Sequence, residues 1–141
     1  MKHGVEKTVH PNGQVAGEVT YVDGLPNGVT RQWHANGVLA AELPMKDGIV
    51  EGLAKQWDEN AKLLGSYEIR NGNGTIRIWH PNGTLQGETP MLNGKWTGRQ
   101  RIWFEDGTLA GEVYWLENKK LPKIKYAAAC KENPSLPRYE D

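Results

Sequence analysis

The chain has one cysteine, one phenylalanine and no net charge, because 17 lysines and arginines balance 17 aspartates and glutamates. With Cys130 alone, no disulfide can form within the chain, which is typical of a reducing compartment. No window approaches the roughly 20 apolar residues of a membrane-spanning helix, and the first residues lack the apolar core of a secretory signal. We therefore expect a cytoplasmic protein. The balanced charge argues against a nucleic-acid partner and disfavours a polybasic membrane-surface module.

What the sequence does contain is a repeat. Tryptophans stand at positions 33, 57, 79 and 103, so the steps between them are 24, 22 and 24 residues. The pattern is clearest in Trp79-His-Pro-Asn-Gly-Thr-Leu-Gln-Gly-Glu88. A first copy has Val9 in the tryptophan position, and a weaker third copy has Ala61 and Ser66 where the others have Gly and Glu. Self-similarity at a fixed spacing is the signature of a repeat architecture.

Each copy has two turn signals that separate runs rich in β-branched and aromatic residues, which predicts one β-hairpin per copy. The Pro-Asn-Gly order after His10 and His80 favours a three-residue loop whose glycine has positive φ. We predict an all-β antiparallel meander of about five hairpins of 22–24 residues over residues 1–118. At Ala61 a non-glycine residue must adopt positive φ, which is uncommon, so this turn should be the most irregular.

The loop type also predicts the register, with Trp33 opposite Leu39. A one-residue slip would move a whole set of side chains to the other face. In the predicted register the tryptophan face also carries Arg31, Leu43 and Met45. In later copies this face carries Met91, Val113 and Trp115. A small residue lies opposite each basic residue, in the series Ala41, Gly65, Gly87 and Gly111. The glutamates are then expected on the other face, in solvent: Glu18, Glu42, Glu88 and Glu112.

The tryptophans and the basic residues beside them are the candidate binding site for another protein, because tryptophan and arginine are enriched at interface hot spots. The candidate residues are Arg31, Trp33, Lys55, Trp57, Arg77, Trp79, Arg101 and Trp103. A bland alternative is that each tryptophan simply fills the core of a curled sheet. Open sheet edges would also permit a homo-oligomer. The alternative function is a glycan- or membrane-surface-binding module that uses the tryptophan ladder.

The sequence offers no constellation for catalysis. His10, His34 and His80 share one repeat position, but equivalent residues in successive hairpins are about 9.6 Å apart, too far to share a metal. Cys130 has no histidine near it in the sequence, and residues 71–74 lack the Lys-Ser/Thr ending of a phosphate loop. We therefore predict a protein that is not an enzyme and that has no cofactor and no metal.

Residues 119–141 fall outside the repeat and are predicted to form a helical cap followed by an extended tail. Pro122 is suited to the first position of a helix, and Leu121, Ile124 and Ala128 recur at helical spacing. A repeat array needs a cap to close its terminal core.

The repeat residues resemble the MORN family, and more closely its bacterial variant. The matching pattern is Trp-x-x-Asn-Gly-x-Leu followed by a small residue and Glu, as in Trp33 to Glu42 and Trp79 to Glu88. The resemblance covers residues 5–118. It implies a string of β-hairpins acting as a non-catalytic interaction scaffold. Because some bacterial members are antitoxins, it also implies a toxin as one candidate partner.

Overall fold

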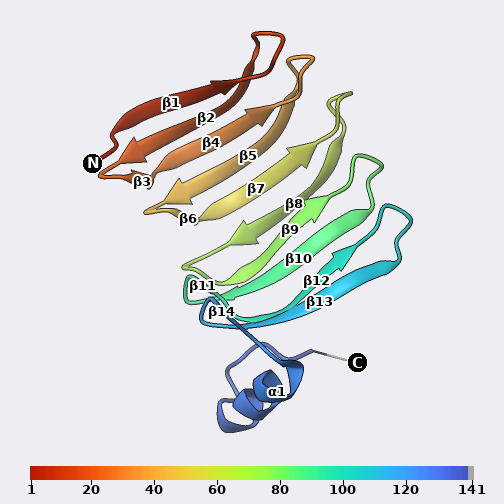
Figure 1. Cartoon of the computed structure of the whole chain (residues 1–141). Helices are drawn as coiled ribbons and strands as arrows, with labels where there is room; N and C mark the ends of the chain where they lie inside the picture. Colours follow the sequence, from red (N-terminus) through yellow and green to blue (C-terminus); the bar gives the residue numbers. More distant parts are fainter. Residues whose placement is uncertain (140–141) are drawn as a thin grey trace. The chain divides into compact units, whose positions relative to one another are not determined.

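The computed structural model describes residues 1–139, which form two compact units, Met1–Glu68 and the residues from Ile69 onward. In each unit consecutive hairpins follow one another in chain order (Figure 1). The strands and the helix are β1 (Gly4–Val9), β2 (Val15–Val22), β3 (Leu25–Pro26), β4 (Gly28–Trp33), β5 (Leu39–Lys46), β6 (Ile49–Val50), β7 (Gly52–Trp57), β8 (Leu63–Ile69), β9 (Gly74–Trp79), β10 (Leu85–Leu92), β11 (Lys95–Trp96), β12 (Gly98–Trp103), β13 (Leu109–Leu116), β14 (Lys119–Leu121) and α1 (Lys123–Glu132).

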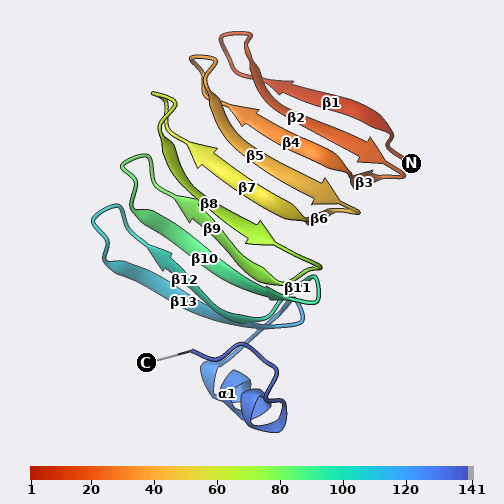
Figure 2. The same cartoon turned by 180° about the vertical axis from the view of Figure 1, so that it is seen from behind.

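The antiparallel hairpin meander with a C-terminal helix is confirmed, but it is divided into two sheets. The first sheet has the order β1-β2-β4-β5-β7-β8, and the second has the order β11-β10-β12-β13-β14 with β9 also paired to β10. In the first sheet the three-residue turns lie at one end of the strands, and β3 and β6 lie at the other end (Figures 1 and 2). The division into residues 1–118 and 119–141 stays a prediction from sequence pattern.

The tight turns form as predicted. In the second hairpin the His34 N–H donates to Val38 O at 2.8 Å and the Gly37 N–H donates to His34 O at 2.9 Å, with Gly37 at φ 89°. In the third hairpin Ala61 takes the glycine's place at φ 66°, as expected. There the Asp58 carboxylate stabilises the turn by accepting from the N–H groups of Asn60 and Lys62.

A β-bulge next to the turns of the first, second, fourth and fifth hairpins corrects the predicted faces. Trp33 pairs with Leu39, as predicted, but the register then shifts by one residue, so that Gln32 pairs with Ala41 and Arg31 with Glu42. The extra residue reverses the alternation in the second strand only. The glutamates therefore share the tryptophan face, whereas Leu43 and Met45 lie on the reverse face. The same shift puts Val113 and Trp115 opposite Gln100 and Gly98, also on the reverse face.

The small residues were consequently misplaced too. Gly87 pairs with Ile78, and Gly111 pairs with Ile102, so neither lies opposite an arginine. A Cβ atom at Gly87 would meet Ile78 Cγ1 at 3.5 Å, which is ordinary van der Waals contact.

The C-terminal segment closes the second unit around a cluster of tyrosines. Tyr114 of β13 and Tyr126 of α1 are buried together with Cys130 and Leu136. Tyr114 contacts the ring of Tyr139 at a centroid distance of 5.2 Å, so the tail packs against the sheet. Pro122 precedes α1 as expected, but the buried helix face is Tyr126 and Cys130, and Ile124 is 80% exposed. The prediction of the buried helix face was wrong because the rings against which α1 packs come from β13 and the tail.

Alkaline pH should weaken this cap. Burial raises the pKa of Tyr126, helped by the Cys130 side chain, and burial also raises the pKa of Tyr114. Both contributions to stability are complete below about pH 10, where unfolded tyrosine ionises, and decline above it. An ionising tyrosine can remove at most about 1.4 kcal/mol of stability per pH unit.

A Tyr126→Phe variant isolates the effect. It loses the hydrogen bond that the Tyr126 hydroxyl donates to Pro137 O, which should cost about 1 kcal/mol at pH 7. Urea unfolding between pH 8 and 11.5 should then show a shallower alkaline decline than in the wild type. Equal slopes in the two proteins would contradict the assignment.

Two glycine substitutions test the corrected faces. Gly87→Ala should change the free energy of unfolding by less than about 1 kcal/mol, because the new Cβ would make only ordinary van der Waals contacts and φ is not positive. Gly72→Ala should cost about 2 kcal/mol or more, since its φ is 79° and the new Cβ would lie 2.2 Å from Gly94 N. Urea denaturation of both variants measures the difference. A loss of more than about 1 kcal/mol for Gly87→Ala would instead support the register first predicted, in which Gly87 lies opposite a basic residue.

Candidate functional site

A ladder of alternating charges crosses the tryptophan face of the first sheet. Cross-strand partners run from Lys7 to Glu18, Arg31, Glu42 and Lys55, one residue from each of five neighbouring strands. Arg31 Nε lies 3.2 Å from Glu42 Oε2, with the two side chains 40% and 32% exposed. Partly exposed pairs of this kind are worth about 0.2–1 kcal/mol each, so the ladder specifies register more than it supplies stability.

The second sheet carries the same ladder over four strands. The partners are Arg77, Glu88, Arg101 and Glu112. Arg77 Nε lies 3.7 Å from Glu88 Oε2, and Arg99 joins the end of the ladder with Nη1 at 4.0 Å from Glu112 Oε2. Opposite charges therefore stand side by side on the tryptophan face in both units.

All eight predicted site residues lie on this face. Each basic residue is two positions before its tryptophan in one strand, so both side chains project to the same side. Trp33, Trp57, Trp79 and Trp103 are all half-buried. Trp33 borders a hollow of about 290 Å³ that Val15 and Glu18 also line. Each indole thus packs on the sheet in part and stays open to a ligand in part.

In the second unit the C-terminal tail narrows the tryptophan face into a groove of about 230 Å³. Arg77, Glu88 and Arg99 line it from the sheet, and Arg138 and Tyr139 line it from the tail. The Arg99 guanidinium lies over the Tyr139 ring, 5.0 Å from its centroid. Arginine is thereby held in place by stacking as well as by charge.

The turn histidines and asparagines of the first, second and fourth hairpins connect each of these hairpins to the one that follows it. His10 Nε2 lies 2.7 Å from Trp33 O and Asn12 Nδ2 donates to Ala35 O at 2.8 Å. The same two contacts join His34 and Asn36 to Trp57 and Glu59 in the first unit, and His80 and Asn82 to Trp103 and Glu105 in the second. Because a carbonyl oxygen can only accept, Nε2 must carry the hydrogen in each case. We call this pair of hydrogen bonds the turn clamp.

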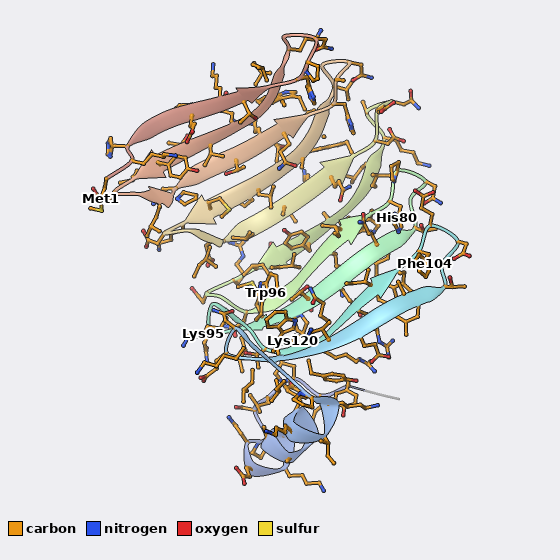
Figure 3. All side chains as sticks on the ribbon, viewed as in Figure 1. Met1, His80, Lys95, Trp96, Phe104 and Lys120 are labelled. Carbon is orange, nitrogen blue, oxygen red and sulfur yellow. The ribbon has the colours of Figure 1, made fainter. Side chains whose placement is uncertain are left out.

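The last hairpin has no donors for a further turn clamp. Phe104 stands in the histidine position and Asp106 in the asparagine position, where its carboxylate accepts from the Thr108 N–H and hydroxyl. In Figure 3, His80 and Phe104 lie at the turn end of the second unit, and Lys95, Trp96 and Lys120 lie at the opposite end of the strands. The clamp therefore has a direction, from each hairpin to the one that follows it.

Replacing a clamp histidine with the residue of the last hairpin measures its contribution. His34→Phe should lower the free energy of unfolding by about 0.5–1.5 kcal/mol, because Trp57 O loses its partner while Phe104 shows that the turn tolerates the ring. His3→Phe, at an exposed position, is the control and should leave urea unfolding unchanged. A loss no larger than in the control would show that the clamp contributes nothing.

Within residues 1–139, no group of three or more His, Cys, Asp or Glu side chains could hold a metal ion. Nor does any helix in that range have the length and apolar character needed to cross a membrane.

Three segments match the family model described as the MORN repeat variant: residues 2–23, 26–47 and 72–93. The match assigns these three segments to the MORN repeat. The matched segments contain His10, His34 and His80, whereas the copies with Asp58 and Phe104 lie outside them. MORN repeats are generally modules that bind proteins or membranes.

Other comparisons add little to the MORN assignment. A search of curated proteins gave no match. A solved structure, the crystal structure of the GtfA/B complex bound to UDP and GlcNAc, is similar over 96% of this chain at 10% identity and a TM-score of 0.32. This chain covers 26% of that chain, and the similarity is too low to carry an argument.

Sequence reasoning missed the glutamates as members of the tryptophan face. A signal was present, because basic and acidic residues alternate at fixed repeat positions from Lys7 to Lys55. Alternating signs on neighbouring strands are expected only when the residues share a face.

Proposed function

We propose that this MORN-repeat protein is a non-catalytic scaffold that binds another protein through its tryptophan face or its open sheet edge. The observation that carries the proposal is the combination of half-buried indoles and a charge ladder on one face. Indoles supply large contact area, and an array of fixed charges selects among partners.

The ladder favours a protein partner over a membrane surface. An anionic membrane attracts a cluster of basic residues, with each contributing about 1 kcal/mol. Here every basic residue of the ladder stands beside a glutamate, as Arg31 does beside Glu42. A surface of alternating sign is complementary to another patterned surface rather than to a uniform one.

The scaffold is proposed to act in the cytoplasm, and a bacterial toxin is the partner that the resemblance to bacterial MORN variants supports. Co-expression with the product of the neighbouring gene tests this specific partner. Rescue of growth by the wild-type chain would support the role. Failure to bind that product would overturn the toxin assignment and leave the scaffold proposal intact.

Substitutions on the tryptophan face test the scaffold itself. Trp57→Ala and Trp103→Ala should each weaken the affinity for a protein captured from the native cell by about tenfold or more, because a buried anchor residue is lost. The measurement is calorimetric titration with the captured protein, after circular dichroism has shown that the variants fold.

Ile124→Ala, at an 80% exposed position on α1, is the matched control and should bind like the wild type. An equal loss in all three variants would place the contact elsewhere. Hydrolytic turnover by the purified chain that one His or Glu substitution abolishes would overturn the non-catalytic proposal.

A further inference from the structure

The outer edge of β1 is the least covered part of the first unit. In the described part of the chain, β1 pairs with β2 on one side and begins the strand order of its sheet. All six of its residues are exposed, with Val5 at 58% and Val9 at 65%. Such an edge presents unpaired backbone groups that can accept another strand.

The junctions between hairpins within each unit show what this kind of edge binds. In every case the second strand of one hairpin places a glutamate opposite the basic residue of the next hairpin, with a small residue just before the glutamate. The three pairs are Glu18 with Arg31, Glu42 with Lys55, and Glu88 with Arg101. The turn clamp then adds two hydrogen bonds to the carbonyls that flank the first residue of the next turn.

The first hairpin has the receiving half of such a junction. Lys7 occupies the basic position, since its cross-strand partner Glu18 is the same residue that pairs with Arg31. Val9 and Pro11 correspond to Trp33 and Ala35, whose carbonyl oxygens accept the clamp from His10 and Asn12. A complementary hairpin is therefore specified at three points, which are the Lys7 side chain and the carbonyl oxygens of Val9 and Pro11.

We propose that the outer edge of β1 binds a β-hairpin of a partner protein, whose adjoining strand places a glutamate opposite Lys7. The turn of this hairpin supplies histidine and asparagine donors to the carbonyls of Val9 and Pro11. The inference rests on the proposed scaffold function and names the chemistry of the partner at the open edge.

A second copy of this chain fits the edge poorly. Two β1 strands related by a two-fold axis would place Lys7 opposite Lys7 in one register and Glu6 opposite Glu6 in the next, and directly opposed like charges are destabilising. A head-to-tail copy could offer Glu112 of β13. However, its turn carries Phe104 and Asp106, which lack both clamp donors, and β14 already pairs with Tyr114–Leu116 of that strand.

A peptide copy of a hairpin tests the proposal directly. The probe is a fluorescein-labelled, backbone-cyclised peptide with the sequence of residues 28–46, because an isolated open hairpin is only marginally stable. It contains His34, Asn36 and Glu42, and its binding to the full chain is followed by fluorescence anisotropy. We expect saturable binding, and about fivefold weaker binding for a peptide with His34→Phe and Asn36→Asp.

Charge exchange locates the contact. A Glu42→Lys peptide should bind the wild-type chain about tenfold more weakly, and a Lys7→Glu chain should prefer that peptide over the original. Lys125→Glu, exposed on α1, is the control chain and should show the wild-type order. If Lys7→Glu does not fold by circular dichroism, the exchange on the peptide decides alone.

Three results would overturn the inference. These are absence of peptide binding, equal binding of both peptides by the wild-type chain, and a dimer in sedimentation that Lys7→Glu abolishes, which would make a second copy the occupant. None of them touches the loss of native-partner affinity expected for Trp57→Ala, so the edge and the scaffold proposals fail separately.

Discussion

One extra residue in the second strand of the first, second, fourth and fifth hairpins determines which side chains meet. With the bulge, Trp33 faces Leu39 while Arg31 faces Glu42; without it, the glutamates would lie on the reverse face. The bulge thus joins indoles, cations and carboxylates on one surface. Because the same shift recurs next to the turns of the first, fourth and fifth hairpins, the tryptophan face of each unit is periodic and its charges form a ladder across neighbouring strands.

The turn clamp gives the repeat a direction. Each clamped hairpin donates two hydrogen bonds forward, so a hairpin without donors ends a series. The last hairpin, with Phe104, is such an end, and the tyrosine cluster of Tyr114 and Tyr126 closes the unit beyond it. The first hairpin is the opposite case, since its carbonyls at Val9 and Pro11 occupy the positions that accept a clamp. A polar array of this kind has two chemically different ends even though its repeats are alike.

Much of the fold followed from local sequence signals. Pro-Asn-Gly after His10 and His80, and the matching positions of the other copies, predicted the loop, its glycine, the Trp33–Leu39 pair and positive φ at Ala61, because each depends on two or three neighbouring residues. The faces did not follow, since no residue type marks where a bulge inserts its extra residue. The helix face failed for another reason: Tyr126 is buried by rings that lie far from it in sequence. Of the site, the Arg–Trp pairs followed from strand alternation, whereas the glutamates required the alternation of charge between neighbouring strands, a signal that the prediction did not use.

A ladder of alternating sign selects partners differently from a basic or acidic patch. Neighbouring charges stand one strand apart, about 4.8 Å, so a bound partner displaced by one strand exchanges every attraction for a repulsion. The ladder of the first sheet, from Lys7 to Lys55, carries two negative and three positive charges and therefore has little long-range attraction. Recognition must come from a partner whose own charges repeat at the strand spacing. The face of another β-sheet has that spacing across its strands, whereas an α-helix, rising about 5.4 Å per turn, drifts out of phase within a few turns. The periodicity of the surface thus favours a β-structured ligand on physical grounds that are independent of its sequence.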